Sequence, residues 1–238
     1  MMSHALVLGA TGLIGSRLLE QLLDDPRWES VTVLARRELP IKHPKLRQQL
    51  CDFESMVATA AASDVRRQTS DQPVSDTLLQ LFTSVDAVFC CLGTTIKQAG
   101  SAVAFRRVDH DYCVAAARLA RSAGVPHFLM VSAVNANARS RVLYPRTKGE
   151  AENAIASLGF NATTFARPSL LIGARQDSRP GESIGIAAMA MIRPLANWSR
   201  ANWLAIEAEK VAAALKRAAE KPDAKGVAHL YYADFIKE

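Results

Sequence analysis

The sequence predicts an α/β fold built on a doubly wound parallel sheet, and three observations support this. Short apolar runs alternate with longer segments of helical periodicity. The apolar runs are nearly continuous, as in strands that are buried on both faces of a sheet. A glycine-rich turn joins the first run to the first helical segment. The length of 238 residues suits one such domain, so we expect residues 1–238 to form a single unit.

Seven segments are predicted to be strands, because each is short and apolar and is bounded by turn residues. They are Ala5–Leu8, Val31–Ala35, Leu46–Cys51, Val85–Cys91, His127–Ser132, Ala162–Ala166 and Val227–Tyr232. The first six alternate with helices, which predicts parallel pairing through crossover connections.

Helices are predicted from apolar residues at helical spacing. They cover Leu13–Leu23, a segment from Pro73 through Phe82, Ala102–Ala123, Tyr144–Leu158 and Glu207–Glu220. Pro40 and Pro44 predict that residues 36–45 hold no helix, or only a very short one. The polar, alanine-rich residues 55–72 give no clear prediction.

The helix over Ala102–Ala123 is the longest predicted, and Gly124 and Pro126 end it. Its inward side is expected to carry Ala104, Val108 and Tyr112 and to continue through Ala116 and Leu119. The segment 169–206, after the sixth strand, is expected to form a small substrate-side lid, with additional core cover as the alternative. The uncharged run 184–192 within it is too short to span a bilayer.

Composition excludes several classes of function. The net charge is +6, but the basic residues are scattered in pairs and no nucleic-acid-binding module is recognisable, so we expect no nucleic-acid partner. No membrane span, secretion signal or metal-ligand spacing is present. The four cysteines lack disulfide spacing, which is typical of free thiols in a reducing compartment and predicts a cytoplasmic protein.

The glycine-rich turn predicts a dinucleotide site. Its candidate cofactor-binding residues are Gly9, Thr11, Gly12, Leu13, Ile14 and Gly15. Glycines at this spacing, between a strand and a helix, permit a tight turn, a close approach of the pyrophosphate and close packing of helix on strand. The N-terminus of the following helix directs free N–H groups at the phosphates.

The end of the second strand bears on the choice of dinucleotide. Arg36 and Arg37 follow it, where an acidic residue would favour NAD and an arginine accommodates the 2′-phosphate of NADP(H). We therefore expect NADP(H), with two solvated loop arginines as the alternative. Asp52, after the third strand, either binds the adenine amine or caps a turn, and the sequence does not decide between the two.

Ser132, Tyr144 and Lys148 form the predicted catalytic centre. Ser132 ends the fifth strand, and Tyr144 and Lys148 are four residues apart, which places them on one face of the next helix. The ammonium of Lys148, together with an oxidised nicotinamide, is expected to lower the pKa of the phenol from about 10 into a useful range. Tyr144 would then protonate a carbonyl oxygen to which Ser132 hydrogen-bonds. The alternative is an exposed helical pair without function.

These motifs together resemble the atypical and extended short-chain dehydrogenase/reductases. The sequences CCLGTT, RVDHDY and YPRTKGEAE are similar to those of the Tat-interacting-protein branch, whose members bind NADPH. The resemblance implies a Rossmann-like sheet, with Gly93, Thr94, Lys148 and Pro168 near the nicotinamide half of the cofactor. It also implies a possible homodimer through the helices Ala102–Ala123 and Tyr144–Leu158. One departure is Asp109, since many extended members carry an Asn early in this helix that assists a relay water.

The resulting functional hypothesis is an NADP(H)-dependent oxidoreductase that reduces a small-molecule carbonyl substrate by hydride transfer. Two alternatives remain open. An NADPH-binding sensor would need no tuned phenol, and an epimerase that retains its cofactor would use NAD, against which Arg36 and Arg37 argue.

Overall fold

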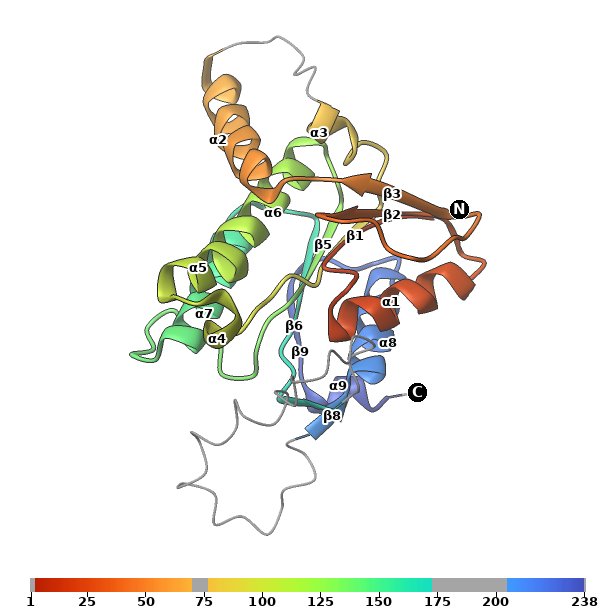
Figure 1. Ribbon diagram of the computed structural model, residues 1–238. Coiled ribbons are helices and arrows are strands. Elements are labelled where there is room, and N and C mark those ends of the chain that lie inside the picture. Colours follow the sequence, from red (N-terminus) through yellow and green to blue (C-terminus); the bar gives the residue numbers. More distant parts are fainter. Residues whose placement is uncertain (1–2, 70–76, 173–204, 238) are drawn as a thin grey trace.

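A computed structural model describes residues 3–69, 77–172 and 205–237, and its centre is a seven-stranded sheet (Figure 1). The strand order is β3-β2-β1-β4-β5-β6-β9, and every neighbouring pair is parallel. The strands are β1 (Ser3–Leu8), β2 (Trp28–Ala35), β3 (Leu46–Leu50), β4 (Ala87–Cys90), β5 (His127–Val131), β6 (Ala162–Ala166) and β9 (Gly226–Leu230). The predicted fold class, a Rossmann-like parallel sheet, is confirmed.

The central strands β1, β4, β5 and β6 are buried on both faces, as continuous apolar strands predict, whereas the edge strands β3 and β9 are largely exposed. Along β1, Leu6 and Leu8 belong to one core cluster, and Ala5 and Val7 belong to the other. The helices therefore form two outer layers. The helices α2, α6 and α7 pack on the first face, and α1 and α8 pack on the second (Figure 1).

The helices follow the predicted order, and α2, α4 and α9 are additional to those predicted. They are α1 (Leu13–Asp24), α2 (Phe53–Thr69), α3 (Thr77–Gln80), α4 (Ile96–Ala99), α5 (Ala102–Arg106), α6 (Cys113–Ser122), α7 (Leu143–Ala156), α8 (Ala208–Ala219) and α9 (Tyr232–Phe235). Of residues 55–72, which carried no clear prediction, the described residues 55–69 lie within α2. Residues 36–45 contain no helix, as expected from their prolines. Pro73, the expected start of a helix, lies outside the described residues.

The long predicted helix differs from expectation at its centre. A π-helical segment, η1 (Arg107–Tyr112), joins α5 to α6. The inward positions at its start are Phe105, Asp109 and Cys113, each at most 1% exposed, and not Ala104, Val108 and Tyr112 as predicted. The prediction failed because it assumed a regular α-helical period and an entirely apolar inner face. π-helical segments often occur at functional sites.

The predicted lid segment 169–206 falls largely outside the described residues, and so does the run 184–192. Its two described ends pair in a second, two-stranded parallel sheet of β7 (Leu170–Ile172) and β8 (Ala205–Glu207). Across the described ranges, no helix combines the length and the apolar character that crossing a bilayer requires.

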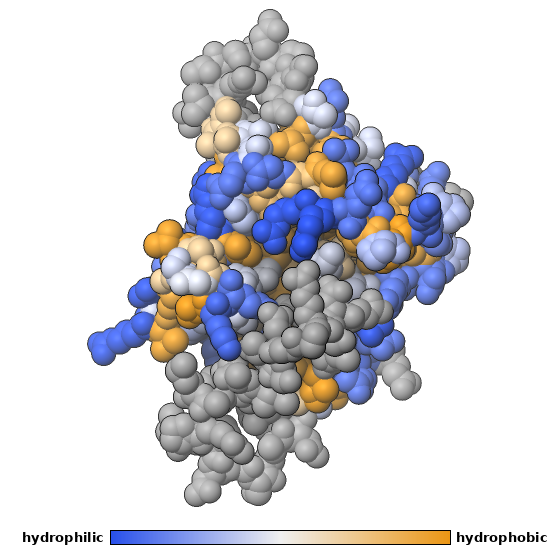
Figure 2. Space-filling view, in the orientation of Figure 1, coloured by the Kyte–Doolittle hydropathy of each residue, from blue (hydrophilic) through white to orange (hydrophobic). Residues whose placement is uncertain are grey.

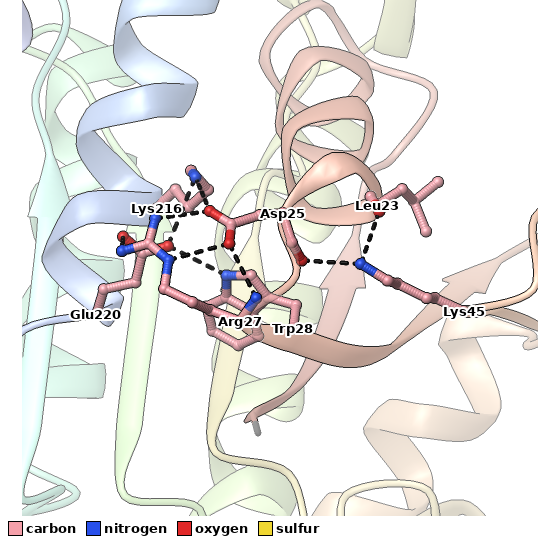
Figure 3. Close-up of polar contacts among 7 residues, drawn as sticks. All are labelled: Leu23, Asp25, Arg27, Trp28, Lys45, Lys216 and Glu220. Atoms are coloured by element: carbon pink, nitrogen blue, oxygen red, sulfur yellow. Dashed lines mark hydrogen bonds and ion pairs between the residues drawn. The ribbon is translucent and has the colours of Figure 1, made fainter. Parts of the chain in front are cut away.

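Polar contacts join the C-terminus of α1 to α8 at the edge of the sheet away from the glycine turn (Figure 3). The Asp25 carboxylate accepts hydrogen bonds from Arg27 Nε at 3.0 Å and from Lys216 of α8. Hydrogen bonds from Arg27, with a further one from Lys216, hold the pKa of Asp25 well below its usual range. Glu220 accepts a hydrogen bond from Trp28 Nε1 at 3.2 Å. Hydrogen bonds between oppositely charged side chains therefore join the first third of the chain to the last third.

His127, at the start of β5, is 6% exposed, and its Nε2 lies 2.9 Å from Thr164 Oγ1. Burial lowers the pKa of His127 from 6.5 to about 4. The unfolded chain therefore takes up a proton as the pH falls through 6.5, whereas the folded chain does so only near 4. The fold should lose stability across this window, by at most about 3 kcal/mol.

Urea unfolding of the wild type and of His127→Gln over this pH range tests this expectation. Glutamine can still pair with Thr164 but does not titrate, so the variant should lose less stability on acidification. Parallel stability curves for the two proteins would contradict the assignment.

Candidate functional site

The glycine turn after β1 is tightly packed. Gly9 has a φ of +79°, and a Cβ on it would lie 2.5 Å from the carbonyl oxygen of Cys91. A Cβ on Gly15 would lie 2.1 Å from the carbonyl oxygen of Gly9. These two positions exclude any side chain, because the backbone itself occupies the space. A Cβ on Gly12 would lie 3.2 Å from the carbonyl oxygen of Gly9, a tight contact that a small backbone shift can relieve.

The start of α1 suits a phosphate group. Gly12 is the N-cap residue, no side chain caps the helix, and its first turn contains no acidic residue. The first N–H groups of a helix lack partners within the helix, and they carry the positive end of its dipole. Leu13 and Ile14 supply such groups beside the exposed Thr11. The predicted cofactor residues of this turn therefore form a cradle with the chemistry that a pyrophosphate needs.

Arg36 and Arg37 lie exposed after β2, and within the described part of the chain neither forms an ion pair. Burial and a hydrogen bond to Glu54 raise the pKa of Tyr112 to about 12, and Arg107 and Arg36 oppose this rise. The charge of Arg36 thus acts on Tyr112 of η1. Its guanidinium has no competing carboxylate among the described residues and remains available for a phosphate.

Asp52 caps α2. Its carboxylate accepts the backbone N–H groups of Glu54 and Ser55, both at 3.2 Å, and these bonds lower its pKa. The structure thus gives Asp52 the capping role, one of its two predicted roles. The side chain is exposed, and an adenine contact stays a prediction.

The predicted catalytic residues come from neighbouring elements at the carboxyl edge of the sheet. Ser132 directly follows β5 and is 3% exposed, and in the described structure its Oγ is buried without a hydrogen-bond partner. Tyr144 and Lys148 lie on α7, which begins at Leu143, one residue before the predicted start. Lys148 is 3% exposed, and its Nζ donates to the carbonyl oxygen of Val131 at 3.3 Å. Lys148 therefore lies beside the strand end that carries Ser132.

A buried carboxylate completes this group. Asp109, on η1, is 1% exposed, and its Oδ1 lies 2.8 Å from Lys148 Nζ. Its Oδ2 accepts the backbone N–H of Thr94 at 2.8 Å. A Cβ on Gly93 would lie 3.4 Å from Asp109 Oδ1 and 3.7 Å from Lys148 Nζ, so the chain passes directly over the ion pair there. From the sequence, Asp109 was noted only because it stands where many extended members of the resembled family carry an Asn.

The pKa of Tyr144 in the protein without cofactor is set by burial and by two charged neighbours. Burial raises it, Lys148 lowers it, Asp109 raises it, and the net direction is upward. The residue as a whole is 40% exposed, while its ring packs at 5.8 Å from that of the fully buried Phe105. Burial is the largest cause of this rise, and the negative charge of Asp109 opposes the lowering by Lys148. The predicted joint effect of Lys148 and an oxidised nicotinamide stays a prediction.

Two further positions complete the site. Pro168, predicted near the nicotinamide, follows β6, and its carbonyl oxygen accepts the N–H of Val134 at 3.0 Å. Gly149, which the sequence did not single out, lets α7 approach the loop after β5. A Cβ on it would lie 2.2 Å from the backbone nitrogen of Ala138. This close approach depends on the loop conformation, so no local pattern in the sequence reveals it.

Comparison with known proteins agrees with this geometry. Residues 9–222 match a family described as NAD(P)H-binding. Protein HTATIP2 of Rattus norvegicus is 36% identical over 179 residues, which cover 74% of this chain and 66% of the relative. The mitochondrial protein FMP52 of Candida albicans is 32% identical over 199 residues, covering 83% and 77%. The match to HTATIP2 confirms the resemblance carried by the sequence motifs.

Solved structures show the same fold. MoeE5 in complex with UDP-glucuronic acid and NAD superposes with a TM-score of 0.68 at 21% identity, covering 96% of this chain and 75% of that one. The oxidoreductase YlbE of Lactococcus lactis superposes with a TM-score of 0.64 at 14% identity, covering 98% and 94%. At these identities the likeness concerns the fold alone.

Proposed function

This chain belongs to the NAD(P)H-binding family, and from that premise we propose that it is an NADP(H)-dependent reductase of small carbonyl compounds. The observation that carries the proposal is the grouping of Tyr144, the buried Lys148 and the unpartnered hydroxyl of Ser132 at the carboxyl edge of the sheet. In open α/β sheets, ligands bind at this edge. The glycine turn and the uncapped start of α1 lie at the same edge.

Ser132, Tyr144 and Lys148 have different roles in the proposed carbonyl reduction. Ser132 Oγ donates a hydrogen bond to the substrate carbonyl oxygen, which satisfies its otherwise unpaired hydroxyl. When bound, the reduced nicotinamide supplies a hydride to the carbonyl carbon. Tyr144 gives its phenolic proton to the carbonyl oxygen, so that the product is the alcohol. Lys148 stabilises the resulting phenolate, which regains a proton from solvent because Tyr144 is 40% exposed.

The surface near Tyr144 supports an apolar substrate. Figure 2 shows hydrophobic side chains on the side of the molecule where α4 and α5 lie in Figure 1. Ile96 on α4, Val103 on α5 and Val142 before α7 are exposed there, with Val103 at 81%. We infer that the carbonyl compound carries an apolar substituent, since such groups gain from contact with this surface.

Fluorescence titration with NADPH and NADH, followed by reduction assays on aldehydes, ketones and quinones, tests the proposal. NADPH should bind and be oxidised in the presence of at least one apolar carbonyl compound. Failure to bind either dinucleotide, or tight binding without reduction of any compound in the panel, would contradict the reductase assignment.

The preference for NADP(H) has its own test at Arg36. Arg36→Ala should weaken NADPH binding about 10- to 100-fold and leave NADH binding nearly unchanged, because it removes a charge-assisted contact to the 2′-phosphate. Arg47→Ala, which removes an exposed arginine of the edge strand β3, is the matched control and should change neither affinity. Equal weakening of NADPH and NADH in Arg36→Ala would refute the assignment.

A further inference from the structure

A neutral pair of buried charges lies behind the predicted proton donor. Lys148 and Asp109 are both at least 97% buried and 2.8 Å apart. Burial by itself lowers the pKa of Lys148, but attraction to Asp109, with smaller contributions from Tyr144 and Cys113, raises it above its usual value. Lys148 is therefore charged, and Asp109 is its ion-pair partner within the core.

Asp109 also fixes the position of Lys148. The ammonium forms an ion pair with Asp109 Oδ1 and donates a hydrogen bond to the carbonyl oxygen of Val131. The second carboxylate oxygen of Asp109 binds the N–H of Thr94, so the loop after β4 is tied to the same pair. The π-helical turn η1 brings Asp109 inward between Phe105 and Cys113. The Asp109 carboxylate thus links η1, the loop after β4 and the helix α7, which carries Tyr144.

Two buried thiols near this pair stay neutral at neutral pH. Burial raises the pKa of Cys91 to about 12. A hydrogen bond with Cys90, together with burial, raises the pKa of Cys113 well above its usual value. Among the described residues, the charges that act on the pKa of Tyr144 are one cation, Lys148, and one anion, Asp109. With an amide in place of Asp109, Tyr144 would face the cation alone.

We propose that Asp109 is a positioning residue that holds and neutralises Lys148, so that Tyr144 stays protonated and the site donates a proton rather than removing one. This inference rests on the proposed function, because it assigns that site a direction, carbonyl reduction over alcohol oxidation. A phenol beside an unopposed ammonium ionises more readily and serves better as a base.

Substitution of Asp109 by asparagine tests the inference, because it preserves shape and removes the charge. Ionisation of Tyr144 is followed in the full-length protein by ultraviolet difference spectroscopy of the phenolate, with Tyr144→Phe in each background to assign the signal. In Asp109→Asn the midpoint should fall by about two pH units. The alkaline limb of the pH profile for NADPH-dependent reduction of phenanthrenequinone should move in the same direction.

Asp111→Asn is the matched control. Asp111 lies on the same π-helical turn but pairs with Arg107 and His110 at the surface, so its substitution should leave the Tyr144 midpoint unchanged. An unshifted midpoint in folded Asp109→Asn overturns the inference. So does a wild-type midpoint at or below the ordinary value near 10, a measurement that stands even if the variant fails to fold.

Different experimental outcomes would refute the inference and the proposed function. Titration with NADPH is run on each protein. If the wild type neither binds NADPH nor reduces the quinone, the proposed function is lost, and the inferred direction is lost with it. If NADPH binds and the quinone is reduced but the Tyr144 midpoint does not respond to Asp109→Asn, only the role of Asp109 is refuted.

Discussion

Replacement of Tyr144 by phenylalanine should reduce NADPH-dependent carbonyl reduction on the order of a thousand-fold, because it removes the group that protonates the carbonyl oxygen. The ring would remain packed at 5.8 Å from Phe105, so neither the fold nor the start of α7 should change. The affinity for NADPH should therefore stay within about two-fold of the wild-type value, since the phenol acts on the substrate. Stopped-flow oxidation of NADPH and fluorescence titration measure the two quantities.

Tyr231→Phe provides the matched control for this experiment. The Tyr231 phenol accepts a hydrogen bond from Arg167 at 2.9 Å beyond the end of β9, so its loss should leave turnover nearly unchanged. Full activity in Tyr144→Phe would show that another group protonates the substrate, and it would remove Tyr144 from the mechanism.

Substitutions in the glycine turn should separate cofactor binding from folding. Gly12→Ala should weaken NADPH binding at least about 100-fold, because a methyl group at the start of α1 keeps the pyrophosphate from the helix N–H groups. The protein should still fold, since the nearest atom to the new methyl lies 3.2 Å away and a small backbone shift accommodates it. Isothermal titration and thermal melting report the two effects.

Gly15→Ala should instead destabilise the protein itself. Its Cβ would lie 2.1 Å from the carbonyl oxygen of Gly9, so the turn must open, at a cost of about 3 kcal/mol or more. Thr11→Ala, an exposed change in the same turn, should affect stability little. The assignment of the turn would be wrong if Gly12→Ala bound NADPH as tightly as the wild type.

Much of this architecture follows from local patterns in the sequence. The apolar strands predicted the parallel sheet, because buried strands require apolar residues. The glycine turn predicted the phosphate cradle, because left-handed backbone, as at Gly9, favours glycine. The sequence pattern of the helix α2 is less distinctive. It is alanine-rich with little contrast between its faces, and its capping residue, Asp52, is equally suited to a turn.

The predictions that failed depend on contacts between distant elements. A carboxylate in a helix is ordinarily a surface residue, so Asp109 was not expected to face Lys148, 39 positions further along the chain. The π-helical turn that brings Asp109 inward departs from the 3.6-residue period by which helices are predicted from sequence. The pKa of Tyr144 is raised chiefly by burial, with a smaller contribution from Asp109, and both depend on elements that are distant in the sequence. The close approach at Gly149 likewise requires knowledge of the loop at Asn137 and Ala138.

The packing of α1 on α8 has a consequence for how the protein is made. The inner side of α1, with Leu18, Leu19 and Leu22, is covered by Val211 and Leu215 of α8, which are synthesised almost 200 residues later. Until α8 leaves the ribosome, the part of α1 that it covers is open to water, and Asp25 at the end of α1 lacks the Lys216 contact. Premature termination before α8 should therefore yield a product that is cleared by proteolysis.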